Sequence, residues 1–255
     1  MDKNKLIKFY EIIDGLEEEY LRYLEINNEF IAKMSEYTKT EDGAQILDII
    51  NNAPKIKKET TTFLQLSSFK NGLIIGMDLE NVNIKQLQEI DDFGSKKENK
   101  EFFSFTEKYN KLTINVIGQL DMYVDILFST LYSMNNRKKD NGFWKNYKEE
   151  LIKFCNIDIE PIQQEMINLK DLRKVRNVYQ HDNGNIDEQF VNYFKPENVH
   201  NFSKVLVSPI SVIVYFASAT TTFFYIIKEI KDIDYKYFNA RCPNLLTLVE
   251  SYNNN

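Results

Sequence analysis

The sequence predicts an all-α protein, and three observations lead to that prediction. First, 8 Gly and 5 Pro in 255 residues are too few for the regular turns of a β-sandwich or barrel. Second, apolar residues recur in several long segments at the three- and four-residue spacing of an amphipathic helix. Third, apolar residues make up 43% of the chain and charged residues 27%, which suffices for a buried core and excludes a disordered chain.

The N-terminal part of the chain is predicted to be helical. A polar break after residue 37 leads to a short helix at residues 44–52, which stops before Pro54. The apolar patterns at residues 63–69 and 73–77 fit either a helix or a short strand. Residues 5–37 form the longest amphipathic pattern, with an apolar stripe through Leu6, Tyr10, Ile13, Tyr20, Leu24 and Ile31.

The strongest change in composition is the polar, Gly-containing stretch at residues 91–100. Such a stretch is typical of a connection between two packed regions. We therefore predict an N-terminal helical region of unknown role at residues 1–95 and a main domain at residues 96–255.

The main domain is predicted to contain four helices. Pro161 suits the first turn of the third helix, and Asn183-Gly184 is a stop signal after it. Three long helices and one short one are most economically packed as a four-helix bundle. The predicted helices are residues 101–134, 143–155, 161–181 and 209–230.

An uncharged run at residues 205–227 offers a second interpretation of the last helix. Its 23 residues are long enough to span a bilayer. Against a span, the run contains six Ser or Thr side chains, has Pro209 near its start and has no second span beside it. We expect a helix buried in the bundle and no membrane association, with a membrane-attached helix as the alternative.

Charge and cysteine content restrict the function classes. The net charge of −6 provides no overall field that would gather nucleic acid. Cys155 and Cys242 are isolated, so we expect neither a disulfide framework nor a structural zinc site. A reducing cytoplasm is the expected compartment.

The segment from Lys170 to His181 reverses the charge of the chain locally. Residues 170–176 contain four basic side chains and one acidic side chain. The whole chain has five arginines, and two of them, Arg173 and Arg176, lie in this segment. Arg176 falls on the apolar side of the predicted helix, where an arginine must either reach outward or find a partner. Asn177 and His181 are one turn apart on one side of the helix.

This segment carries a family resemblance. Arg176, a polar residue directly after it, and His181 after four intervening residues resemble the motif of the HEPN superfamily, all-α domains of toxins, abortive-infection proteins and RNA-guided effectors. The helical setting over residues 100–232 is similar too, and residues 1–95 would then be an N-terminal helical extension of a HEPN-like four-helix bundle.

The resemblance implies metal-independent cleavage of RNA, with Arg176, Asn177 and His181 as catalytic residues and with no cofactor. It also implies a homodimer, since one chain offers one motif and therefore one catalytic Arg and one catalytic His, and a role as a toxin or anti-phage effector. An antitoxin or regulatory partner would then bind the N-terminal region. The alternative is a catalytically inactive HEPN-like module that mediates protein or nucleotide binding.

A pair of acids in the first main helix is expected to support the site. Asp121 and Asp125 are one turn apart on an apolar stripe, where acids need a cationic partner. Arg176 or Arg173 on a facing helix is the predicted partner. A half-exposed face with both acids solvated is the other interpretation, and a metal or glycosidase-type acid pair has no supporting residues nearby.

Other basic side chains are predicted to contact the RNA backbone. Phe143 and Trp144 are candidates for stacking on bases, although both also suit a core. His200 has no polar partner at helical spacing and is interpreted as structural. The predicted RNA-binding residues are Lys170, Arg173, Lys174, Arg137, Lys138 and Lys139.

Overall fold

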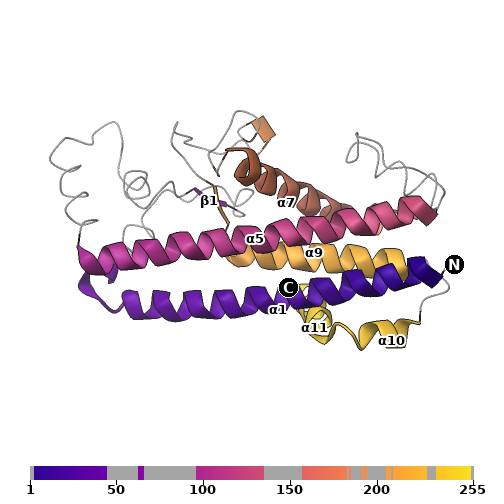
Figure 1. Ribbon diagram of the computed structural model, residues 1–255, viewed down its shortest axis with the longest axis horizontal. Helices are drawn as coiled ribbons and strands as arrows, with labels where there is room; N and C mark the ends of the chain where they lie inside the picture. Colours follow the sequence, from indigo (N-terminus) through magenta and orange to yellow (C-terminus); the bar gives the residue numbers. More distant parts are fainter. Residues whose placement is uncertain are drawn as a thin grey trace. The chain divides into compact units, whose positions relative to one another are not determined.

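The computed structural model confirms an all-α fold (Figure 1). Among the residues that the structure describes, the regular structure other than helix is a two-stranded antiparallel ribbon, β1 (Phe63–Gln65) and β2 (Val205–Val207), in which Leu64 lies opposite Leu206. The structure describes residues 3–44, 63–65, 96–134, 157–182, 184, 190, 192–193, 205–207, 209–228 and 234–253. The helices are α1 (Lys3–Tyr37), α5 (Lys97–Met134), α7 (Gln163–Asp182), α9 (Pro209–Lys228), α10 (Tyr235–Asn239) and α11 (Pro243–Asn253).

Four predicted helices are confirmed within a few residues of their ends, as α1, α5, α7 and α9. A 3₁₀ turn, Glu160–Ile162, precedes α7, with Pro161 inside it. The predicted helix at residues 143–155, the pattern at 73–77 and the helix at 44–52 beyond residue 44 lie outside the described residues.

Helix α9 begins at Pro209, the predicted start of the fourth helix, and residues 205–207 at the start of the uncharged run form β2. No element is predicted after residue 230, whereas α10 and α11 lie there. Both had local signals, because Asp234 caps α10 by accepting from two backbone N–H groups and Pro243 occupies the first turn of α11.

The chain divides into two compact units, which are described separately here. Unit 1 comprises Met1–Tyr23, Val116–Arg173 and Val212–Asn255, and unit 2 comprises Leu24–Asn115 and Lys174–Ser211. Residues 91–95, at the predicted domain boundary, are outside the described residues, so the division at residue 95 stays a prediction.

The core of unit 1 is built on α9. Phe216 and Phe223 of α9 are fully buried, and their rings lie 5.2 Å from Tyr20 and 6.2 Å from Phe9 of α1. The later residue of α9 pairs with the earlier residue of α1, so the two helices run antiparallel. The part of α1 up to Tyr23 therefore shares one core with α9.

Burial of α9 accounts for its apolar sequence. Among the described residues, one helical segment, Ser211–Lys228, is long and apolar enough to cross a membrane, with a mean hydropathy of 1.3. Within the structure, 67% of that segment is buried. The central helix of a packed core has the same length and composition, so this finding is weak evidence for a membrane span.

The buried stripe of α1 differs from the predicted one. Leu24 is half-buried and Ile31 is 55% exposed, although both were placed on the apolar stripe. The predicted stripe advanced in steps of seven residues, and a straight helix rotates by about 20° per seven residues, so the stripe left the buried face. The apolar residues of α1 that are buried among the described side chains are Phe9, Ile12, Ile13, Leu16, Tyr20, Tyr23 and Tyr37.

A carboxylate of α1 caps the last helix of unit 1. Glu17 is 7% exposed, and its Oε1 and Oε2 accept hydrogen bonds from the backbone N–H groups of Asn244 (2.9 Å) and Leu245 (3.0 Å). These are the first-turn donors of α11, which a side chain at the helix N-cap usually satisfies. Cys242 precedes α11 and offers only a weak acceptor, so Glu17 supplies the cap from 227 residues away.

Two neighbouring groups surround this cap. Arg241 donates from Nε to Asp14 Oδ1 at 2.7 Å and from Nη2 to Asp14 Oδ2, which ties the start of α11 to α1 a second time. The Cys242 thiol is buried beside it. Burial, with smaller contributions from the carboxylates of Glu17 and Asp14, raises the pKa of Cys242 to about 12.

In unit 2, aromatic rings join α1 to α5. The ring of Phe30 stacks on Tyr109 at 3.9 Å, and the ring of Tyr37 stacks on Phe102 at 3.7 Å. Later residues of α1 again meet earlier residues of α5, so these helices also run antiparallel.

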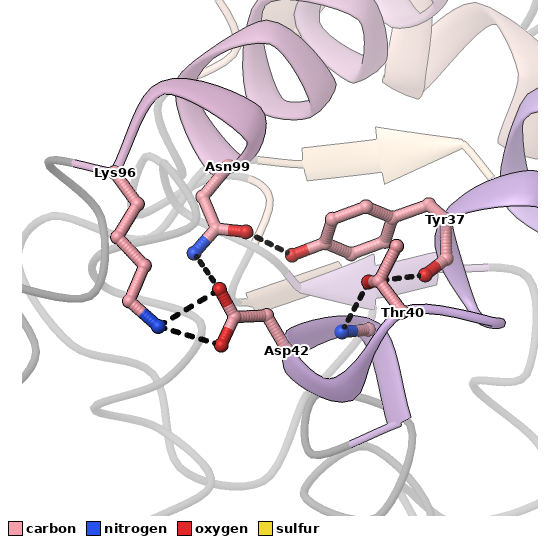
Figure 2. Close-up of polar contacts among 6 residues, drawn as sticks. Tyr37, Thr40, Asp42, Lys96 and Asn99 are labelled. Carbon is pink, nitrogen blue, oxygen red and sulfur yellow. Dashed lines mark hydrogen bonds and ion pairs between the residues drawn. The ribbon is translucent and has the colours of Figure 1, made fainter.

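A network of polar side chains in unit 2, formed by Tyr37, Asp42, Lys96 and Asn99, links the end of α1 and the residues after it to the start of α5 (Figure 2). The amide of Asn99 is fully buried, with its oxygen accepting from the Tyr37 hydroxyl at 2.7 Å and its nitrogen donating to Asp42 at 3.0 Å. Lys96 donates to Asp42 at 2.7 Å, which holds the pKa of that carboxyl below its usual value. These bonds connect residues 37–42 to residues 96–99 on either side of a long intervening segment.

We expect Glu17→Gln to destabilise the protein by about 1–3 kcal/mol, because two first-turn N–H groups of α11 lose a charged acceptor. Glu18→Gln, at the exposed neighbouring position, should change the free energy of unfolding by less than about 0.5 kcal/mol. Urea unfolding of both variants measures the difference, and equal effects would contradict the capping role of Glu17.

The Cys242 thiol should be unreactive in the folded protein. At pH 8, a pKa of about 12 leaves a thiolate fraction of about 10⁻⁴, roughly 10³-fold below that of an unfolded cysteine. In a Cys155→Ser variant, the absorbance change with an aromatic disulfide reagent should therefore be slow without urea and fast in urea. A fast reaction of the folded variant would show that this thiol is not buried.

Candidate functional site

Helix α7 carries the predicted motif, and an apolar stripe orients the helix. Pro161 lies in the 3₁₀ turn before α7, and the backbone N–H of Glu160 donates to the Asp158 side chain at 3.0 Å. The apolar side chains that α7 buries recur every three residues, so each is turned by about 60° around the helix axis from the one before it. They are Leu169, Leu172, Val175 and Val178.

In unit 1, two side-chain contacts hold the first part of α7. Asn168 donates to Ser218 of α9 at 2.8 Å. Arg173 donates from Nη1 to Asp125 of α5 at 2.8 Å, and both side chains are about one-quarter exposed (24% and 25%). Of the two arginines that the sequence analysis offered as partners for the acids, the structure pairs Arg173 with Asp125.

Asp121, one turn before Asp125, is 3% exposed. The interpretation in which both acids are solvated is therefore wrong for Asp121 and only partly right for Asp125. The predicted support of the catalytic residues by Asp121 and Asp125 stays a prediction.

In unit 2, the last turns of α7 carry Arg176, Asn177 and His181. Arg176 and Asn177 are half-buried, and the Arg176 guanidinium donates from Nη1 to Asn177 Oδ1 at 3.1 Å. His181 is exposed and lies in the last turn of the helix. The bond to Asn177 holds one nitrogen of the Arg176 guanidinium.

A tyrosine in the middle of the motif was not predicted to matter. Tyr179 is half-buried, and its hydroxyl accepts a hydrogen bond from Asn110 Nδ2 of α5 at 3.0 Å. Burial raises the pKa of Tyr179 to about 12, although the bond from Asn110 acts in the opposite direction. The sequence shows Tyr179 only as a large aromatic residue next to an apolar position of the helix. Nothing in that pattern identifies Asn110, 69 residues earlier, as its hydrogen-bond partner.

The predicted RNA-binding residues have different surroundings. Lys170 of unit 1 is exposed. Lys174 of unit 2 is half-buried, with its Nζ 5.5 Å from the ring centre of Tyr193, a cation–π contact. The remaining candidates lie outside the described residues, as do Phe143, Trp144 and His200. These candidates are Arg137, Lys138 and Lys139.

No protein-family model matches the chain, and no curated protein or solved structure matches it.

The Arg173–Asp125 pair should contribute measurably to stability. In a double-mutant cycle of Arg173→Gln and Asp125→Asn, we expect a coupling free energy of about 1 kcal/mol, reduced by partial exposure of both groups. The Lys33–Glu36 pair of α1 is the control, because its side chains are 53% and 67% exposed. Its coupling should be clearly smaller than that of the Arg173–Asp125 pair, because solvent screens exposed charges, and equal couplings would contradict a special role for the α5–α7 pair.

Proposed function

We propose that this protein is a metal-independent endoribonuclease of the HEPN type and that Arg176, Asn177 and His181 are its catalytic residues. One observation carries the proposal: the guanidinium of Arg176 is held by its neighbour Asn177, on the same helix whose last turn exposes His181.

The chemistry of RNA cleavage fits these side chains. The 2′-hydroxyl of a ribose loses its proton to His181, and its oxygen attacks the adjacent phosphorus. The bond from phosphorus to the 5′ oxygen then breaks, and that oxygen receives a proton from an acid. The products are a 2′,3′-cyclic phosphate and a 5′-hydroxyl, and histidine is the side chain that exchanges protons near neutral pH.

Arg176 would stabilise the transition state. Negative charge accumulates on the non-bridging phosphate oxygens as the new bond forms, and a guanidinium can meet two of them with parallel hydrogen bonds. A guanidinium already restrained by a hydrogen bond to Asn177 loses less conformational entropy when it binds the phosphate. This arrangement supports a role in catalysis rather than in the folded state alone.

The reaction needs both a base and an acid, and each chain provides one His181. A second copy of the chain would supply the second imidazole, so the proposed active form is a homodimer. This form would act as a toxin or defence effector, with residues 1–95 available to a regulatory partner.

The second candidate function is a catalytically inactive HEPN-like module that binds proteins or nucleotides. The position of His181 favours it, because a cation in the last turn of a helix is stabilised by the helix dipole by about 0.3–1 kcal/mol without any substrate. Arg176 lies more than one turn from the helix end, where this effect is small.

Cleavage of structured RNA in excess EDTA tests the proposal. We expect the wild type to produce 2′,3′-cyclic phosphate ends, and the double variant Arg176→Ala, His181→Ala to lose at least about 10²-fold in rate. Gln180→Ala is the matched control, since Gln180 is an exposed residue of the same turn and should retain the wild-type rate.

Two results would contradict the nuclease. One is a wild type that cleaves no faster than the double variant. The other is cleavage that leaves a 5′-phosphate, since that product requires a different nucleophile. Circular dichroism of each variant ensures that the helices are intact.

A further inference from the structure

The end of α7 is supported from both sides of Tyr179. On one side, Asn110 of α5 donates to the Tyr179 hydroxyl at 3.0 Å. On the other, Gly184 lies against the ring, and a Cβ atom added at Gly184 would come within 2.6 Å of Tyr179 Cε1. Tyr179 therefore joins the neighbouring helix to the chain that leaves α7.

Gly184 also fixes the turn that follows the helix. Its φ of +81° lies in the left-handed region, which residues with a side chain rarely adopt. Its backbone N–H donates to the Val178 carbonyl at 3.1 Å, which ties Gly184 back to the last turns of α7. The Nζ of Lys174, five residues before Tyr179, lies over the ring of Tyr193.

We propose that Tyr179, held by Asn110 and packed on Gly184, is a positioning residue that fixes the last turn of α7 and with it the imidazole of His181. This inference rests on the proposed function, because it concerns the same site, but the geometry that carries it involves no RNA.

The physical reason is the behaviour of helix ends. The last turn of a helix frays because its carbonyl groups lack partners within the helix. His181 is exposed in that turn, so its own surroundings do little to hold it. A displacement of about 1 Å in a catalytic group can cost about 10²-fold in rate, and Tyr179 is two residues from His181, within the same turn.

Hydrogen exchange and NMR test the positioning without RNA. In Tyr179→Phe, which removes one hydroxyl, we expect the backbone amides of residues 179–182 to exchange about fivefold faster, the effect of losing one neutral hydrogen bond. Asn110→Ala removes the donor from α5 and should give the same result without any change in α7. The matched control is Tyr123→Phe, another half-buried tyrosine, which should leave these amides unchanged.

NMR spectroscopy observes the imidazole ring of His181 directly. The chain has two histidines, His181 and His200, so His200→Gln assigns both ring signals in a carbon–proton correlation spectrum. In Tyr179→Phe, the His181 signal should move toward its value in an unfolded peptide, and the His200 signal should stay in place. Two results for Tyr179→Phe overturn the proposal. One is that the amides of residues 179–182 exchange within 1.5-fold of the wild-type rate, which is about the error of a rate ratio. The other is that amide exchange in α1 and α9 accelerates by the same factor.

An activity measurement separates the two proposals. In Tyr179→Phe, we expect kcat for RNA cleavage to fall about tenfold with KM unchanged within about twofold, because an interaction that orients the base acts in the transition state. A fall in kcat with unchanged exchange overturns the positioning role. A wild type without cleavage overturns the proposed function alone, because the exchange rates and the His181 signal do not depend on RNA.

Discussion

The proposed site depends on one constraint, the rotation of the last two turns of α7 about the helix axis. Val175 and Val178 are buried on one face, and the bond from Asn110 to Tyr179 anchors a second point of the same turns. Because successive residues are separated by about 100° around a helix, these anchors also set the directions of Arg176, Asn177 and His181. A rotation of one residue would bury the guanidinium without a partner, which is costly.

The ends of two helices show how the same electrostatic effect serves different purposes. At the N-terminus of α11, the buried carboxylate of Glu17 accepts from first-turn N–H groups and ties the chain's first helix to its last. At the C-terminus of α7, the dipole favours a cation, and His181 lies there. The dipole explains a histidine at that place, but it acts too weakly at Arg176 to explain an arginine oriented by Asn177.

Periodicity in the sequence predicted the long helices because it reports a local property. Helices α1 and α5 bury part of their surface and expose the rest, so apolar residues recur at the helical period along them, whereas α9 is buried on most sides and is marked by its uncharged run. The same method misplaced the stripe of α1 beyond about residue 20, since an error of a few degrees per residue accumulates over several turns. It overlooked α10 and α11 because both are short, although Asp234 and Pro243 are recognisable start signals.

The sequence by itself determined that Arg176, Asn177 and His181 share the last turns of one helix, since the spacing of residues on a helix follows from backbone geometry alone. It also indicated that Asp125 needed a cation. Only the tertiary structure decided which cation, because Arg173 is 48 residues from Asp125, Asn110 is 69 residues from Tyr179, and Glu17 is 228 residues from Leu245. Partners at such separations are chosen by how the apolar faces of the helices pack, and that packing is a property of the whole fold.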